Sequence, residues 1–237
     1  QVLGAARDAL GWIGLRVESE LNAAVDNPLV FVALPRADKA VSGGNFHGAP
    51  VGYAMDLLKI VVTDVASQSE RRAYLLTDYR FDDAPRRGLS LPLFLVPPGA
   101  APEGLSSGLM IPQYTAASLV SACKTLAHPD SVDSIPSSAG QEDHVSMSMN
   151  AARHARMIVE HAEAVVAIEI LLAAQALDLR AGEGVPGAGV AAAHARLRAD
   201  VPPLAFDRGL HADIQRTLDL VRSGALVAAA DAAVATG

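Results

Sequence analysis

Cysteine, aromatic residues and long basic runs are all scarce in this sequence of 237 residues. Cys123 is the only cysteine, so the chain forms no internal disulfide, and a reducing, cytoplasmic setting fits this usage. The formal net charge is −7, which argues against nucleic acid or an anionic membrane surface as a partner. The most apolar stretch, residues 164–177, is shorter than the ~20 residues that a membrane helix needs, so we expect no membrane span.

Several familiar site motifs are also missing. The sequence has no phosphate-binding glycine loop of the Walker or dinucleotide type. GLSSG (104–108) has the spacing of a nucleophile elbow around Ser106, but GAAPE before it does not predict the strand that an elbow requires. His144, His154 and His161 are ten and seven residues apart, which is too far for one ion on a single helix. We therefore predict neither a serine nucleophile nor a metal site.

The sequence is instead rich in alanine and half apolar, which favours helices. N-terminal residues 2–24 carry apolar side chains at steps of three and four, and a chain that begins inside such a pattern is expected to be a piece of something longer. One short strand is expected at 29–34 and a long irregular connection at 79–107. The other helices, apart from the longest, are predicted over residues 50–77, 109–127, 190–199 and 211–234.

The longest helix is predicted from Ser138 to about Arg180. Ser138 followed three residues later by Gln141 has the pattern of a capping box, and the helical pattern continues for roughly 40 residues, or about 60 Å. The middle of this segment is apolar on every side, which indicates burial all round. We expect that a chain of this size needs partner subunits to bury it. The fold class that follows is all-α, built on long helices.

Two short segments carry the candidate chemistry, SGGNFHGAP (42–50) and QEDHVSM (141–147). Phe46 either anchors its loop in the core or forms one wall of a site. Asn45 and His47 are expected to make hydrogen bonds to loop backbone. An acid such as Glu142 in a first helical turn is stabilised by the helix dipole, typically by under ~1 kcal/mol, without any catalytic role. The alternative is that its carboxylate faces a pocket, and the residues alone leave both interpretations open.

Taken together, the segments resemble the aromatic amino-acid ammonia-lyases, and within that family the histidine-specific branch. The similarity runs from Gln1 nearly to the end, and several blocks match in order, so it is more specific than any single motif. The blocks are ELNAAVDNPLVF (20–31), SGGNFHGAP (42–50), SQSERRAYLL (67–76), SSGLMIPQYTAASLV (106–120), LAHPDSVDSIPSSAGQEDHVSM (126–147) and AIEILLAAQALDLR (167–180).

The resemblance implies the C-terminal half of a helical enzyme that assembles as a homotetramer around a central bundle. Residues 1–180 would form the long-helix core with its active-site loops, and residues 181–237 the smaller C-terminal helices. The implied reaction is elimination of ammonia from a small aromatic amino acid, and QEDH favours L-histidine, converted to urocanate in histidine catabolism. A phenylalanine or tyrosine ammonia-lyase or an aminomutase remains an alternative.

The resemblance also assigns roles to residues. Glu142 matches the catalytic acid near the leaving amine or the imidazole, Phe46 matches the aromatic side chain beside substrate and electrophile, and Gln141 is expected to support substrate binding. The structural residues of the loop are Gly43, Gly44, Asn45 and His47. We expect the loop glycines to let the backbone pass close to the catalytic centre. No metal is implied.

The family's electrophile is a methylidene-imidazolone formed from an internal Ala-Ser-Gly, and this sequence contains no Ala-Ser-Gly. Gly140 also stands where the family usually has asparagine. The chain is therefore expected to be inactive alone and to require an N-terminal half as its partner. A helical module that serves only oligomerisation, without catalysis, is the alternative from another functional class.

Overall fold

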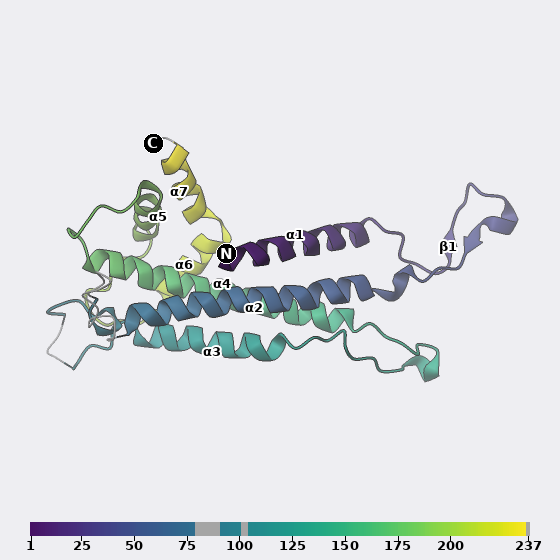
Figure 1. The fold of residues 1–237 in the computed structure, drawn as a ribbon, viewed down its shortest axis with the longest axis horizontal. Helices are drawn as coiled ribbons and strands as arrows, with labels where there is room; N and C mark the ends of the chain where they lie inside the picture. The colour runs from purple at the N-terminus through teal and green to yellow at the C-terminus, as the bar shows by residue number, and fades with distance from the viewer. Residues whose placement is uncertain (79–90, 101–103, 236–237) are drawn as a thin grey trace. The chain divides into compact units, whose positions relative to one another are not determined.

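The computed structural model describes residues 1–78, 91–100 and 104–235 of the chain. Across these ranges the chain is α-helical apart from one small antiparallel ribbon, which confirms the predicted all-α fold class (Figure 1). None of the helices in the described ranges is long and apolar enough to cross a membrane. The helices and strands are α1 (Val2–Leu21), β1 (Leu29–Val30), β2 (Ala40–Val41), α2 (Ala49–Thr77), α3 (Met110–Leu126), α4 (Ser148–Leu179), α5 (Ala188–Arg198), α6 (His211–Arg222) and α7 (Ala225–Ala235). The short 3-10 turns are η1 (Arg36–Asp38), η2 (Asn45–His47), η4 (Leu93–Leu95) and η5 (Ser138–Gly140).

Most predicted helices have the expected bounds. α2 and α3 begin and end within one residue of the predicted ranges, and α1 ends at Leu21, earlier than the predicted residue 24. The predicted helix over 211–234 is two helices, because Gly224 adopts φ +70° and interrupts the right-handed conformation between α6 and α7. The expected strand at 29–34 is limited to two residues of a ribbon with register Leu29↔Val41. Much of the expected irregular connection at 79–107 lies outside the described residues.

The predicted start of the longest helix is wrong. α4 begins at Ser148 rather than Ser138 and has 32 residues, or about 48 Å of axis. Ser138 and Ala139 have φ of 52° and 55°, which a right-handed helix excludes, so no helix follows the expected capping box. The expectation that partner subunits complete the burial of the apolar middle of this helix stays a prediction, and the chain itself already covers much of that surface. Within this single chain no residue from 161 to 180 is exposed.

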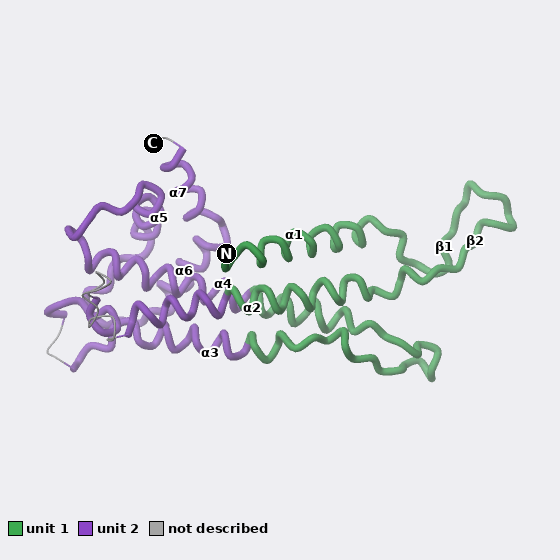
Figure 2. Tube along the Cα trace, viewed as in Figure 1, with its two compact units in different colours: residues 1–65, 123–159 green, residues 66–122, 160–237 purple. Residues whose placement is uncertain are grey.

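The chain divides into two compact units (Figure 2). Unit 1 comprises residues 1–65 and 123–159, and unit 2 comprises residues 66–122 and 160–237, so α2, α3 and α4 contribute residues to both. In unit 1 the hydroxyl of Thr63 in α2 donates to the carbonyl oxygen of Cys123 in α3 at 3.5 Å. Burial raises the pKa of the Cys123 thiol. The Thr63–Cys123 contact joins α2, which follows the 42–50 loop, to α3, which precedes the segment that carries residues 141–147.

Unit 2 holds two apolar clusters. The larger joins α2, α3 and α4, and a charged contact crosses beside it, where Glu169 of α4 accepts from the hydroxyl of Ser69 at 2.6 Å and pairs with Arg72. The buried members of this cluster are Ala73, Leu91, Leu95, Leu109, Ala116, Val165, Ile168, Leu172, Ala176 and Leu204. The smaller cluster joins α4 to the C-terminal helices through Leu171, Ala174, Leu197, Val201, Leu220 and Leu226.

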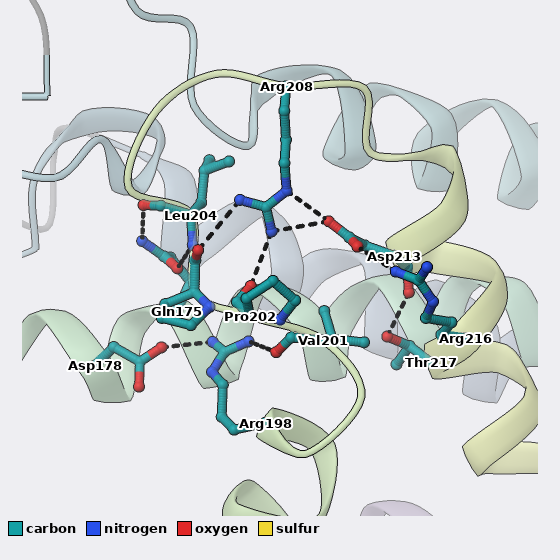
Figure 3. Close-up of polar contacts among 11 residues, drawn as sticks. Gln175, Asp178, Arg198, Val201, Pro202, Leu204, Arg208, Asp213, Arg216 and Thr217 are labelled. Atoms are coloured by element: carbon teal, nitrogen blue, oxygen red, sulfur yellow. Dashed lines mark hydrogen bonds and ion pairs between the residues drawn. The ribbon is translucent and has the colours of Figure 1, made fainter.

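The segment between α5 and α6 is fixed by polar side chains (Figure 3). The buried amide of Gln175 in α4 donates to the carbonyl of Leu204 at 3.1 Å and accepts from its N–H at 2.9 Å. Arg208 donates to the carbonyl oxygens of Pro202 and Pro203 and pairs with Asp213 at 2.9 Å. Side chains therefore satisfy several backbone groups of this loop, which forms no ladder of its own.

Candidate functional site

The loop at residues 42–50 is a short 3-10 turn placed at the start of α2. Gly48 ends the turn with φ +76°, and a Cβ added there would lie 3.0 Å from the hydroxyl oxygen of Ser148 at the start of α4. Glycine is required at this position by both its backbone conformation and the close approach. Gly43 and Gly44 show no such close approach within the described part of the chain, because a Cβ added at either would meet none of its atoms within 4 Å.

Asn45 and His47 make hydrogen bonds to positions outside the loop, rather than the local side-chain bonds to loop backbone that the sequence predicts. The side chain of Asn45 donates to the carbonyl of Ala24 at 3.5 Å, and the carbonyl of His47 accepts from the hydroxyl of Ser146 at 2.7 Å. Phe46 lies between them with 51% of its surface exposed, so the ring is not an anchor in the core of this chain. An aromatic side chain that the fold leaves uncovered at a fixed turn can form a wall for a ligand or pack against another chain.

The segment that carries Glu142 is a tight turn rather than a helix end. Ser137 and Glu142 pair as an isolated antiparallel bridge, with the Ser137 N–H donating to the Glu142 carbonyl at 2.9 Å. Gln141 follows η5, and its N–H donates to the Ser138 carbonyl at 3.1 Å. The side chains of Gln141 and Glu142 are exposed. Because Glu142 is outside any helix, the expected stabilisation by a helix dipole does not apply.

The two candidate segments meet in unit 1. The Ser146–His47 hydrogen bond joins them, and the rings of His47 and His144 lie with their centroids 5.3 Å apart. An added Cβ on Gly52 of α2 would come within 3.4 Å of the Ser146 carbonyl, so the starts of α2 and α4 are closely packed here. The turn bearing Phe46 is therefore fixed against the segment bearing Glu142.

Sequence reasoning missed His144 and Ser146 as contacts between the two segments. The sequence offers only weak signals for them, since a histidine and a serine in a turn-rich segment have many ordinary roles. His144 also lies outside α4, so it does not share a helix with His154 and His161 as expected. Among the described residues, no group of three or more His, Cys, Asp or Glu side chains could hold a metal ion.

The GLSSG segment makes a different kind of contact. The N–H groups of Ser107 and Gly108 donate to the carboxylate of Asp207 at 2.6 and 3.0 Å, so these amides stabilise a loop in unit 2. The described part of the segment, residues 104–108, contains no strand. In the described ranges around it, 91–100 and 104–108, no strand leads to Ser106 as one does in a nucleophile elbow.

Comparison with known proteins identifies the group to which this chain is related. The family model described as "Aromatic amino acid lyase" matches residues 1–199. A histidine ammonia-lyase from Anaeromyxobacter sp. (strain K) is 52% identical over 226 residues, which cover 95% of this chain and 42% of that protein. The chain therefore spans about two fifths of the length of the curated relative that it matches.

Solved structures agree in fold. A crystal structure of histidine ammonia-lyase from Trypanosoma cruzi has a TM-score of 0.86 and 40% identity, covering 98% of this chain and 43% of that one. A tyrosine aminomutase from Streptomyces globisporus also has a TM-score of 0.86, with 33% identity, covering 98% of this chain and 42% of that one. The resemblance drawn from the ordered sequence blocks is thus confirmed. The chain belongs to the aromatic amino acid lyase family.

Proposed function

We propose that this chain is part of an ammonia-lyase that converts L-histidine to urocanate by eliminating ammonia without oxidation. One observation carries the proposal: the segments bearing Phe46 and Glu142 are joined through the 2.7 Å Ser146–His47 contact, in a chain about half identical to proteins named histidine ammonia-lyase. An exposed ring and an exposed carboxylate on joined turns can together meet an amino acid that has both an aromatic ring and a charged amine.

In this proposal Phe46 forms a wall against the substrate ring, and Glu142 is the catalytic acid beside the leaving amine or the imidazole. A carboxylate stabilises an ammonium or a protonated imidazole through charge-assisted hydrogen bonds. Gln141 precedes Glu142 in the same turn and supports substrate binding. The residues that hold the loop of Phe46 are Gly43, Gly44, Asn45 and His47.

The electrophile proposed for this enzyme is a methylidene-imidazolone, which withdraws electrons from the bound amino acid when it is present. The 237 residues contain no Ala-Ser-Gly from which it forms, so these residues fit only part of its surroundings. The half-exposed ring of Phe46 is the side chain of this site that suits packing beside a planar group. We therefore propose that the chain alone is inactive and acts with an N-terminal half that carries the electrophile, without a metal.

Exposed apolar side chains support the proposal that this chain contacts further chains. α1 buries only Ile13 and leaves Trp12 and Leu15 45% and 61% exposed. Exposed apolar surface of this kind is typical of contacts with another chain or segment. We propose a cytoplasmic homotetramer, with residues 1–180 as the long-helix core and 181–237 as smaller C-terminal helices.

The substrate and outcome have alternatives within the family. The equal TM-scores to a histidine ammonia-lyase and a tyrosine aminomutase mean that the fold leaves both outcomes open. A phenylalanine or tyrosine ammonia-lyase or an aminomutase is therefore the second candidate. A helical module that serves only oligomerisation is the third, and it predicts no product from any of these amino acids.

The test uses the full-length protein that contains this chain, incubated separately with histidine, phenylalanine and tyrosine. Urocanate from histidine supports the proposal, a cinnamate-type product or a β-amino acid supports the second candidate, and no product supports the third. Glu142→Gln should lower turnover by about 100- to 1000-fold, because a preorganised charge is lost where charge moves. Glu183→Gln, at an exposed glutamate in unit 2, is the matched control and should leave turnover within about threefold.

The Glu142→Gln result also separates two roles for the carboxylate. A contact with the imidazole predicts a greater loss with histidine than with phenylalanine, whereas a contact with the amine predicts similar losses. If turnover of Glu142→Gln with every substrate stays within about threefold of the parent, the catalytic assignment is wrong.

A further inference from the structure

A lysine is fully buried in unit 1, in the part of α2 that follows the Phe46 loop. The side chain of Lys59 has 0% exposure, and its ammonium donates to the Asp130 carboxylate at 2.5 Å and to the His128 carbonyl at 2.7 Å. It also pairs with Asp56, one turn earlier in α2, at 2.7 Å. Three contacts match the three donors of an ammonium group, so this buried charge is fully paired.

The carboxylate of Asp56 holds the same stretch of chain through the backbone N–H groups of that stretch. Its two carboxylate oxygens accept from the N–H groups of Asp130 at 3.1 Å and Ser131 at 2.8 Å. Burial raises the pKa of Asp56, but the hydrogen bonds from Lys59 and Ser131 and from the backbone of Asp130 outweigh it and hold the pKa below its ordinary value. Lys59 and Asp56 together form a clamp on residues 128–131, which we call the buried clamp.

The clamped residues begin the crossing segment (residues 127–147), which connects α3 to α4. Within it the structure has only the η5 turn and the isolated Ser137–Glu142 bridge as regular elements. The next tether along the segment is the hydroxyl of Ser134, which accepts from the Val145 N–H at 2.9 Å. The turn that carries Glu142 therefore projects from a base whose position is set by side chains, because little backbone pairing holds it.

We infer that Lys59 is a positioning residue, which acts through residues 128–131 to hold the Glu142 turn in its working geometry. The inference rests on the proposed function, in which Glu142 meets the substrate. A misplacement of about 1 Å in an active-site group can cost about 100-fold in rate, so a clamp at the base of an otherwise loose turn affects turnover.

A purely structural role for the clamp makes a different prediction. Buried ion pairs often contribute little net stability compared with apolar residues of the same size, so burial alone does not explain why a lysine is used here. If the clamp only stabilises the fold, then a folded variant without it should retain its turnover. If it acts through Glu142, its loss should matter only while Glu142 is present, and a double-mutant cycle measures this dependence.

The experiment measures kcat with histidine in the full-length protein, for Lys59→Met in the parent and in the Glu142→Gln background. Lys59→Met should lower kcat about 10- to 100-fold in the parent and by less than about threefold in the Glu142→Gln background. Lys124→Met removes an exposed lysine of α3 in the same unit and is the matched control, expected within about threefold of its parent in both backgrounds.

Circular dichroism first establishes that each variant is folded. If Lys59→Met does not fold, Asp56→Asn replaces it, because asparagine keeps the size and one acceptor oxygen of the clamp. Asp56→Asn should lower kcat several-fold in the parent and should have no further effect in the Glu142→Gln background.

Two results overturn the inference while the proposed function stands: a folded clamp variant with unchanged kcat, or an equal loss of kcat in both backgrounds. If Glu142→Gln itself leaves kcat unchanged, the proposed role of Glu142 fails, and this inference fails with it. The two failures are therefore distinguished by the Glu142→Gln single variant.

Discussion

The contact between Gln175 and Leu204 offers a direct test of how unit 2 holds its C-terminal helices. Gln175 is 3% exposed and Leu204 is 4% exposed, and the glutamine amide satisfies both backbone groups of Leu204 (Figure 3). Gln175→Leu keeps a side chain of similar size but removes both partners. The N–H and the carbonyl of Leu204 would then be buried without hydrogen bonds.

The size of the effect follows from these two groups. Each buried backbone group left unsatisfied costs about 1–3 kcal/mol, which gives about 2–6 kcal/mol for the pair. The added apolar surface of leucine offsets about 1–2 kcal/mol of this loss. At the middle of these ranges the free energy of unfolding should therefore fall by about 2–3 kcal/mol, and by up to about 5 kcal/mol.

Urea unfolding followed by circular dichroism measures the loss of stability, and hydrogen exchange of the Leu204 amide measures the local change. Gln215→Leu is the matched control, because Gln215 is exposed on α6 and its replacement should change stability by no more than about 0.5 kcal/mol. If Gln175→Leu unfolds at the same urea concentration as the parent and the Leu204 amide stays equally protected, then the Gln175 amide does not stabilise this loop and the reasoning is refuted.

Two further predictions concern a glycine and a carboxylate. Gly108→Ala should destabilise by about 2–4 kcal/mol, because φ is +55° and the new Cβ would lie 2.5 Å from the carbonyl oxygen of Phe94. Gly104→Ala is the control and should cost only about 1–2 kcal/mol in thermal or urea unfolding, because φ is +86° but no atom of the described residues lies within 4 Å of the new Cβ. Burial raises the pKa of Asp56, but the hydrogen bond from Lys59 and those from backbone N–H groups outweigh it, so the pKa is lowered in the folded state. The ionised carboxylate therefore contributes its full stabilisation above about pH 4, and this stabilisation is lost as the pH falls further. Acid unfolding should accordingly depend less steeply on pH below about 4 in Asp56→Asn, and equal slopes for variant and parent would contradict this assignment.

The sequence by itself determined the helical class and most helix bounds. Alanine-rich, apolar-periodic segments such as residues 50–77 and 109–127 form helices whose local preference agrees with their packing, so α2 and α3 have the predicted ends. Ordered blocks such as SGGNFHGAP and QEDHVSM also indicated the family, which one motif could not have done. Sequence pattern was sufficient wherever local and tertiary forces favour the same conformation.

Where local and tertiary forces favour different conformations, only the tertiary structure decided the outcome. Ser138 and Gln141 have the local pattern of a helix start, yet Ser138 adopts a positive φ and the chain forms a turn there instead. The contact of Ser146 with His47 joins positions 99 residues apart, a pairing that neither residue type indicates. Such contacts depend on which backbone groups the packed helices bring together and leave in need of a partner, and local sequence pattern does not contain that information.

The buried clamp shows the same division at a single residue. The sequence places Asp56 and Lys59 three residues apart in an apolar helix pattern, which is a visible but ambiguous signal of an ion pair. Their contacts with Asp130, more than 70 residues further along, exist because the end of α3 brings the crossing segment over α2. The sequence thus determined that a charged pair lies on α2, whereas the fold decided that it is buried and which segment it holds.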